Sequence, residues 1–324
     1  EIGNVIVTIG PTGGPTVLIF AYAMTHPAHR MHEPYEPRVV TDEDGRRRIR
    51  GRGAAEQRGA LAAGLLAAAA VREQELRGRL VLCVSPAGET GRHDAASTLC
   101  AALGARPEWC IVAIGTGNAI GIANKGRLDA TVVVRGRTAH SGQPWKGRNA
   151  IEGAARVLDR LAAVRPPRKH PQLGTATVTP TSIRSWPEAT HTVQDEVRIV
   201  VDRRLLPGDD PELALAELRE ATAVPDWDVE VVPGAYMYPS ELPPQHALVD
   251  LLRAAFADAG DGAPPLLYSH GGIDAGFFNH TGVPAVMLGP GEQSQWHTAE
   301  EAVCLADVEL CASVYASAVL RHLT

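Results

Sequence analysis

Short apolar runs rich in β-branched residues alternate with longer segments of helical spacing in the first third of the chain. The runs at 5–9, 17–20, 80–85 and 110–114 predict buried strands. The intervening segments, 57–77 and 95–103, predict helices. Because strands that alternate with helices form a mainly parallel sheet with helices on its faces, this pattern predicts an α/β domain.

The pattern changes after residue 126. A βαββαβ unit of roughly one hundred residues is predicted there, with strands at 130–134, 175–183, 197–201 and 228–232 and helices at 150–164 and 211–223. The first pattern then resumes with a helix at 247–259, a strand at 285–288 and a helix at 307–322. We therefore predict an α/β domain, formed by 1–125 and 237–324, that is interrupted by an inserted ferredoxin-like domain at 126–236.

Composition excludes several classes of function. The 324 residues are 45% hydrophobic and 21% charged, with a net charge of -6, as in a globular protein. The basic run Arg46–Arg50 is flanked by acidic residues and predicts a loop or hairpin, so we expect no nucleic acid partner. No apolar segment approaches the ~20 residues that span a bilayer, so we expect no membrane partner. Five cysteines without a CxxC pair predict buried free thiols and a cytoplasmic protein.

Four acidic or histidine residues lie near the predicted strand ends, where ligands of open α/β sheets bind. They are Glu56, Glu89, Glu108 and His297. Carboxylate oxygens with one imidazole nitrogen and water suit a single Zn²⁺ or Mn²⁺ ion. The alternative for Glu89 and His297 is that they are buried polar groups with hydrogen-bond partners.

The ordered set of motifs resembles the di-zinc amidohydrolase and peptidase family of acetylornithine deacetylase, succinyl-diaminopimelate desuccinylase, aminoacylase and carboxypeptidase G-type enzymes. The resemblance covers nearly the whole chain and implies a zinc-peptidase-like α/β sandwich domain with an inserted ferredoxin-like lid domain. It implies that Glu56, in the segment 51–59, takes the metal-bridging position and that Glu89, in Gly-Glu-Thr-Gly, is a metal ligand. It also implies ligand roles for Glu108, before a strand, and for the final histidine, His297.

The resemblance implies a substrate site and a dimer as well. The segment Gly-Arg-Thr-Ala-His-Ser would place His140 across a dimer, near the scissile carbonyl, so we expect a homodimer formed through the inserted lid domain. Arg204, in Asp-Arg-Arg, would bind a substrate carboxylate, and His191 loosely matches a lid asparagine. Asp274 and Gly289 would belong to loops that contact a small-molecule substrate.

The departures from the family pattern concern the metal site and the base. Tyr22 and Met24 stand where the family has a histidine ligand and the aspartate that orients it, and Glu56 replaces a bridging aspartate. Gly88 stands where the family has its glutamate base, a group that contributes about 10²- to 10⁴-fold to the rate. The resemblance therefore predicts that one metal position is lost and that the usual base is absent.

Alternatives stay open for several residues. Arg204 could form a surface ion pair, and Asp274 could only orient a loop. Tyr22 could bind metal as a phenolate, donate a hydrogen bond to substrate, or fill the space that a metal vacated. His26, His29 and His32 could bind metal or substrate, or belong to a solvated loop. Direct replacement of the lost ligand by His26 is geometrically poor, because four extended residues span roughly 13 Å.

Three classes of function follow. The first is a hydrolase of a C–N bond in a small acylated amino acid or peptide-like substrate, with one metal or an altered base. The second keeps the fold and pocket for acyl transfer, condensation or elimination. The third is a protein that binds without catalysis. Lid and ligand-side loops that match the family favour a pocket still in use.

Overall fold

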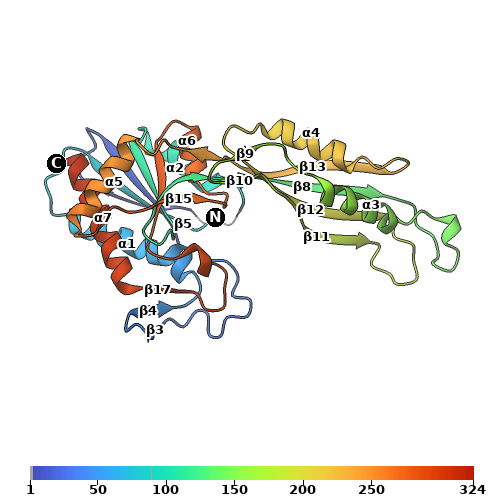
Figure 1. Ribbon diagram of the computed structural model, residues 1–324, viewed down its shortest axis with the longest axis horizontal. Helices are drawn as coiled ribbons and strands as arrows, with labels where there is room; N and C mark the ends of the chain where they lie inside the picture. Colours follow the sequence, from blue (N-terminus) through green and yellow to red (C-terminus); the bar gives the residue numbers. More distant parts are fainter. Residues whose placement is uncertain (1–2, 89) are drawn as a thin grey trace. The chain divides into compact units, whose positions relative to one another are not determined.

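The computed structural model describes residues 3–88 and 90–324 (Figure 1). These residues form two compact units. Unit 1 comprises the chain up to Asn124 together with Ser240–Ser269 and Ile273–Thr324, and unit 2 comprises Lys125–Pro239 and His270–Gly272. The inserted domain was predicted at 126–236.

Unit 1 is built on a mixed eight-stranded sheet, to which a small three-stranded sheet is added. Its strands are β1 (Val5–Ile9), β2 (Thr16–Tyr22), β3 (Arg38–Thr41), β4 (Arg47–Arg50), β5 (Arg79–Ser85), β6 (Trp109–Ala113), β7 (Ile120–Asn124), β14 (Ser240–Glu241), β15 (Leu266–Ser269), β16 (Ala285–Leu288) and β17 (Ala302–Cys304). Its helices are the π-helix η1 (Ala54–Arg58), α1 (Gly59–Val71), α2 (Asp94–Leu103), α5 (Ala247–Asp258), α6 (Ala275–His280), the 3-10 helix η3 (Gln293–Gln295) and α7 (Leu305–Leu323).

The centre of the large sheet is parallel. The strand order is β1-β5-β2-β6-β16-β7-β14, with β15 on β7, and β5, β2, β6 and β16 are mutually parallel neighbours. All seven residues of β2 are buried, as expected for a strand covered on both faces. Val17, Ile19 and Ala21 pack toward α1, α5 and α7, whereas Leu18 and Phe20 pack toward α2 and α6. The predicted α/β architecture is confirmed.

The predicted basic hairpin also forms, since β3 and β4 pair antiparallel and β17 adds to β4.

The described residues contain no disulfide. Four of the five cysteines are buried, and Cys100 is partly buried. None of the helices in residues 3–88 and 90–324 is both long and apolar enough to span a membrane.

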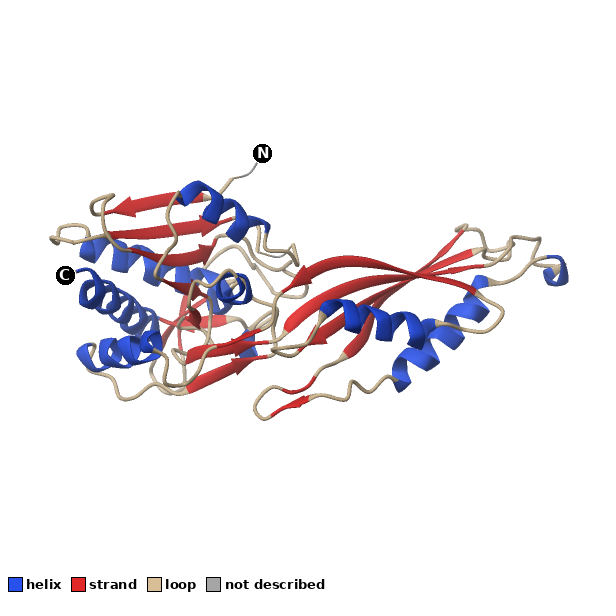
Figure 2. Cartoon of the chain, turned by 90° about the horizontal axis from the view of Figure 1, so that it is seen from above, coloured by secondary structure: helices blue, strands red, loops and turns tan. Residues whose placement is uncertain are grey.

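Unit 2 has the predicted βαββαβ order. Its elements are β8 (Gly126–Arg135), the 3-10 helix η2 (Pro144–Lys146), α3 (Ala150–Ala163), β9 (Lys169–His170), β10 (Gly174–Thr175), β11 (Val178–Trp186), β12 (Glu196–Leu205), α4 (Pro211–Thr222) and β13 (Asp228–Met237). The antiparallel sheet has the order β11-β12-β8-β13, and the inward residues of β8 and β12 pack with α3 and α4 in one core (Figure 2). This is a ferredoxin-like topology.

Candidate functional site

The carboxyl ends of β2 and β5 bring three of the four departures from the family pattern together: Tyr22, Met24 and Gly88. A Cβ atom added to Gly88 would lie 2.1 Å from Cε of Met24 and 2.6 Å from Cδ1 of Tyr22. Both distances are far inside van der Waals contact. The side chains of Tyr22 and Met24 therefore occupy the space that a glutamate at position 88 would need.

Tyr22 is hydrogen-bonded within the protein. Its side chain is buried, and its hydroxyl donates to Oδ2 of Asp274 at 2.5 Å. Burial, and then the neighbouring Asp274 carboxylate, raise the pKa of Tyr22 well above its ordinary value. The phenol is therefore held in its protonated form. Of the alternatives considered for Tyr22, this geometry favours filling of the vacated space.

Asp274 has a second partner, which the sequence reading missed. Nδ1 of His93 lies 2.6 Å from Oδ1 of Asp274, and both side chains are buried. Asp274 precedes α6, whereas His93 caps the amino end of α2. Both oxygens of Asp274 are thus bound by protein groups, although the sequence predicted a contact between Asp274 and substrate. No local signal links two residues that are 181 positions apart.

Glu56 and His297 form a second polar pair in unit 1. Glu56 is buried, and its Oε1 lies 3.1 Å from Nε2 of the partly exposed His297. The ring of His26 stacks on that of His297, with centroids 3.8 Å apart and planes 16° apart. His29 lies beside His26, whereas His32 is exposed and pairs with Glu33. The structure thus brings together two predicted ligands and one loop histidine.

Glu56 is held at the carboxyl edge of the sheet by backbone contacts. Gly115, after β6, donates its N–H to the carbonyl oxygen of Glu56 at 2.7 Å. A Cβ on Gly291 would lie 1.9 Å from the carbonyl oxygen of Ala55, so only glycine fits at position 291. Gly289 is similarly enclosed, since its Cβ would lie 2.4 Å from the carbonyl oxygen of Ile114. The predicted substrate residue Gly289 thus has a clear packing requirement.

Glu301 fixes the turn that carries Glu56, and the sequence reading missed this residue too. Its fully buried carboxylate accepts hydrogen bonds from Nη1 of Arg52 at 2.8 Å and from the N–H groups of Gly53, Ala55 and Glu56 at 2.9, 3.1 and 3.0 Å. Four donors on one carboxylate leave little freedom to the backbone of residues 52–56. The sequence signal that could have identified Glu301 was its position shortly after His297.

The structure does not bring Glu108 to this site. Glu108 precedes β6, and its exposed carboxylate pairs at 2.8 Å with Nε2 of His322 near the end of α7. The parallel strands β2 and β6 end side by side, and Ile114 follows β6 at the level of Tyr22 in β2. Ile114 is buried and apolar, so it offers no ligand there. The ligand role predicted for Glu108 is corrected on this ground. Glu89, another predicted ligand, lies outside the described residues.

The predicted residues of unit 2 lie in loops and at a strand end. His140 and His191 are exposed, with ring centroids 6.3 Å apart, and Nδ1 of His140 accepts from the N–H of Gly142 at 3.0 Å. Arg204 makes a bidentate pair with Asp202 at 2.8 and 2.9 Å. Such a pair is the alternative to a substrate contact for Arg204.

Lys125 adds a second cation near Arg204. The lysine is buried, and its Nζ donates to the carbonyl oxygen of Thr175 at 2.6 Å. Burial, and then the positive charge of Arg204, lower the pKa of Lys125. The two cations therefore lie close enough for their charges to interact.

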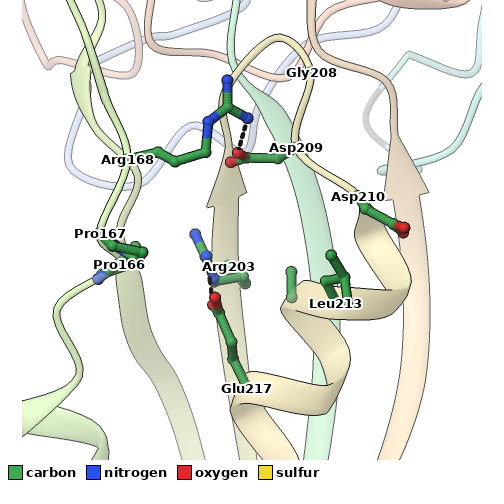
Figure 3. A pocket seen from close by; sticks show the side chains of 10 residues that line it. Pro166, Pro167, Arg168, Arg203, Gly208, Asp209, Asp210, Leu213 and Glu217 are labelled. Carbon is green, nitrogen blue, oxygen red and sulfur yellow. Dashed lines mark hydrogen bonds and ion pairs between the residues drawn. The ribbon is translucent and has the colours of Figure 1, made fainter.

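A small pocket of unit 2 is lined by Arg203, the middle residue of the Asp-Arg-Arg segment, and by residues near the start of α4 (Figure 3). Arg203, the middle residue, is buried there and pairs with Glu217 of α4 at 2.9 Å. Arg168 pairs with Asp209 across the same pocket. Both arginines of the pocket are thus paired with carboxylates of its own lining, so this pocket gives no support for a substrate site.

The comparisons with known proteins agree with this fold. A model of the family described as Peptidase family M20/M25/M40 matches residues 25–321. The chain belongs to this family. Protein YgeY of Escherichia coli K12, which is named only as uncharacterized, is 26% identical over 315 residues, covering 90% of this chain and 76% of that protein. A succinyl-diaminopimelate desuccinylase of Alkalilimnicola ehrlichii is 27% identical over 319 residues, covering 90% and 78%.

Solved structures of the M20 family have the same fold. An M20 family metallo-carboxypeptidase from Sulfolobus solfataricus superposes with a TM-score of 0.77 at 18% identity and covers 98% of this chain and 87% of its own. The YXEP protein of Bacillus subtilis, described as a dinuclear metal binding peptidase, gives a TM-score of 0.69 at 16% identity, covering 99% and 85%.

The Glu56–His297 pair of this M20 member offers donors that suit a metal ion. Glu56 and His297 present an oxygen and a nitrogen to each other, a donor set that suits zinc or manganese. No three His, Cys, Asp or Glu side chains converge as a metal site within residues 3–88 and 90–324. At the other predicted position, Tyr22 gives its hydroxyl to Asp274 and Met24 offers only a thioether. That second position does not fit a zinc ion.

Proposed function

We propose that the protein is an amidohydrolase that cleaves the C–N bond of a small acylated amino acid or peptide-like substrate and uses one metal ion. The Glu56–His297 pair carries this proposal, because it keeps two family ligands in contact on the family's fold. The relatives named succinyl-diaminopimelate desuccinylase support the class of substrate. Loss of the second metal position is part of the proposal and rests on Tyr22 and Met24.

In the proposed mechanism, Glu56 and His297 would hold the ion, with Glu89 as a further ligand. A bound zinc or manganese ion polarises a carbonyl group and so favours attack on it. The residues of this chain set the geometry. Glu301 fixes the backbone of Glu56. The Tyr22 ring and the Met24 side chain fill the space next to Gly88.

Unit 2 supplies the remaining proposed roles. Arg204, with Lys125 beside it, would bind the carboxylate of an acylated amino acid, since guanidinium groups bind carboxylates in bidentate geometry. His140 would contact the substrate's carbonyl group from a second copy of the chain. We therefore also propose a homodimer, which sedimentation at micromolar concentration would test.

Metal analysis tests the central proposal. Protein purified without added metal is expected to hold one zinc or manganese per chain, and Glu56→Gln and His297→Ala should each lower that content several-fold. Thr298→Ala, next to His297, is the matched control and should keep the metal. A content of two metal ions per chain would overturn the single-site proposal. A content of zero would overturn the proposal that the protein is a metallohydrolase.

A substrate panel tests the reaction. N-acetyl, N-succinyl and N-carbamoyl amino acids and dipeptides are incubated with the protein, and the released amine is quantified. We expect turnover of at least one acylated amino acid, with KM raised for Arg204→Met and kcat lowered for His297→Ala. A protein that releases no amine from any member of the panel contradicts the proposed hydrolysis.

A second candidate function is favoured by Gly88. The glutamate that would activate water is absent, so transfer of the acyl group to an amine, or an elimination, is compatible with the same pocket. Mass spectrometry of products formed with an added amine acceptor distinguishes the two. An acyl-amine product that exceeds the free acid would favour transfer over hydrolysis.

A further inference from the structure

Unit 1 contains a cavity of about 370 Å³ beside the turn that carries Glu56. Its walls come from the loop before β3 and from β4, η1, α1, β17 and the start of α7, which lie together in unit 1 (Figure 1). Glu56 and His297 are not among the described residues that line it. The cavity is therefore separate from the candidate metal site.

Most of the cavity wall is apolar. Ile49, Val303 and Val308 contribute aliphatic side chains from β4, β17 and α7. Tyr35 and Leu66 also line the cavity, and they are 61% and 52% exposed. An apolar group that covered such surface would be stabilised by about 25 cal/mol for each Å² removed from water. The wall therefore favours a ligand with an apolar body.

The charge of the cavity comes from two arginines. Arg52 is buried and pairs with Glu301 at 2.8 Å, so its charge is neutralised within the protein. Arg58 is exposed, and its guanidinium forms no hydrogen bond or ion pair with any residue in 3–88 and 90–324. No acidic side chain is among the described residues of the lining. One positive charge is thus left at the cavity without a counter-charge.

The pocket of unit 2 in Figure 3 shows the opposite arrangement. Its Arg168 and Arg203 pair with Asp209 and Glu217 of the same lining. An anion that entered that pocket would have to displace a carboxylate of the protein. An anion beside Arg58 would displace only water, and charge-assisted hydrogen bonds between guanidinium and carboxylate groups are among the strong ones. The charge of the unit 1 cavity therefore favours a carboxylate.

The dimensions of the cavity favour a small molecule over a protein. Sites for small ligands are commonly hollows of about 300–1,000 Å³, and this cavity lies within that range. Protein interfaces of standard size use roughly 20–30 residues on each side. Fourteen described residues line the cavity, and they surround a single hollow.

We propose that this cavity binds a small monocarboxylate with an apolar body. Arg58 pairs with the carboxylate, and the apolar body lies against Tyr35, Leu66 and Val303. The site is additional to the one that contains Glu56. The inference does not depend on the proposed hydrolysis, so each proposal can fail without the other.

Calorimetric titration of the whole chain with octanoate tests the class of ligand. We expect saturable binding of one octanoate per chain. Octan-1-ol has the same apolar chain without the charge and should bind more weakly, and octylamine, which carries the opposite charge, should bind most weakly. Absence of saturable octanoate binding would overturn the site. Octan-1-ol that binds as tightly as octanoate would overturn the selection of a carboxylate.

Substitution of Arg58 tests its pairing with the carboxylate. Arg58→Gln should weaken octanoate binding by about 2- to 5-fold, the effect of an exposed ion pair, and leave octan-1-ol binding unchanged. Arg47→Gln removes an exposed arginine that does not line the cavity and should bind octanoate as the wild type does. Equal octanoate affinity in both variants would contradict the role of Arg58.

Two neighbouring leucines of α1 test the location. Leu66 lines the cavity and Leu65 does not, although their exposed fractions are similar at 52% and 50%. Both variants should fold, because neither side chain is buried. Leu66→Asp should weaken the binding of octanoate and of octan-1-ol several-fold, whereas Leu65→Asp should change neither. Equal binding by the two variants would place the ligand elsewhere.

Two further measurements exclude other occupants. His297→Ala should bind octanoate with the wild-type affinity, since a carboxylate bound at the metal site would lose affinity in that variant and would overturn the proposal. Sedimentation tests whether a second copy of the chain covers the cavity. Leu66→Asp should keep the oligomeric state of the wild type. A dimer that Leu66→Asp separates, while Leu65→Asp leaves it intact, would overturn the small carboxylate as the occupant.

Discussion

Gly88 and Tyr22 fit together so closely that a single added carbon cannot be placed between them. The Cβ of any other residue at 88 would lie 2.6 Å from Cδ1 and 2.7 Å from Cε1 of the Tyr22 ring. The Tyr22 ring has little room to move, because its hydroxyl is hydrogen-bonded to Asp274 and the ring packs in a buried core cluster. A side chain at position 88 and the Tyr22 ring in its present place therefore exclude each other.

Gly88→Ala is accordingly expected to destabilise the protein by about 1–3 kcal/mol, the usual effect of overpacking. Part of the loss should be recovered in Met24→Ala/Gly88→Ala, because Cε of Met24 is the atom closest to the added carbon. Urea unfolding measures both free energies. Gly262→Ala is the control, since nothing lies within 4 Å of its added carbon. Equal stability of Gly88→Ala and the control would contradict the close fit.

Tyr22→Phe tests the bond to Asp274. Removal of the hydroxyl leaves a buried carboxylate with one donor fewer, so we expect a loss of about 1–3 kcal/mol at pH 8. The folded-state pKa of Tyr22 is raised, so its contribution is complete below the unfolded-state pKa and is lost as pH rises toward the folded-state pKa.

The difference in unfolding free energy between wild type and Tyr22→Phe should therefore shrink as the pH rises above about 10. Urea unfolding at pH 8, 9.5 and 11 measures it. The exposed Tyr35→Phe serves as the reference and should show no such difference. A difference that grows with pH would mean that Tyr22 is ionised in the folded protein.

The fold could be predicted well from the sequence because its strands are marked by apolar runs. β1 lies where predicted, and β2 and β5 extend the predicted strands by only a few residues. α1 is shorter than the predicted helix, since the chain leaves the helix after Val71 so that Arg77 can bond to the end of α7. Several short elements of unit 1 were missed, because two to six residues show little periodicity; these are β7, β14, β15, β17 and α6.

The site could be predicted only where residues lie in recognisable local motifs. Glu56 and His297 are such residues, and they meet. Glu108 was misplaced because an apolar run does not reveal which end of β6 faces the site, whereas the parallel register with β2 does. The pairing of Asp274 with His93 is created by the packing of α2 and α6 on one face of the sheet, which no local pattern encodes.

Glu301→Gln should be among the most disruptive single changes in unit 1. An amide in place of the buried carboxylate presents a donor to either Arg52 or the N–H groups of residues 53–56, so at least one of those bonds is lost. Breaking a buried pair in this way destabilises by about 3–5 kcal/mol. Thermal and urea unfolding measure the effect.

The neighbouring residue supplies a matched control for Glu301. Glu300 is exposed and pairs with Arg50 at the surface, so Glu300→Gln should change stability little. If Glu301→Gln unfolded at the same urea concentration as Glu300→Gln, the hydrogen bonds to the turn would contribute nothing measurable. A stable Glu301→Gln with reduced metal content would instead indicate that the turn has moved Glu56.

Glu108→Gln distinguishes the two positions that an acidic residue near β6 could take. The exposed pair with His322 is at the amino end of the strand, away from Tyr22 and Glu56, so its loss should lower stability by at most about 1 kcal/mol. Metal content and amine release should both match the wild type, whereas Glu56→Gln should lower both. A metal content that falls in Glu108→Gln as it does in Glu56→Gln would mean that Glu108 is a ligand after all, and that the amino end of β6 approaches the metal.

Ile114→Glu is the complementary variant, because Ile114 stands at the other end of β6. It adds a carboxylate after the strand's carboxyl end. A rise in bound zinc per chain would show that the metal lies on this side of the sheet.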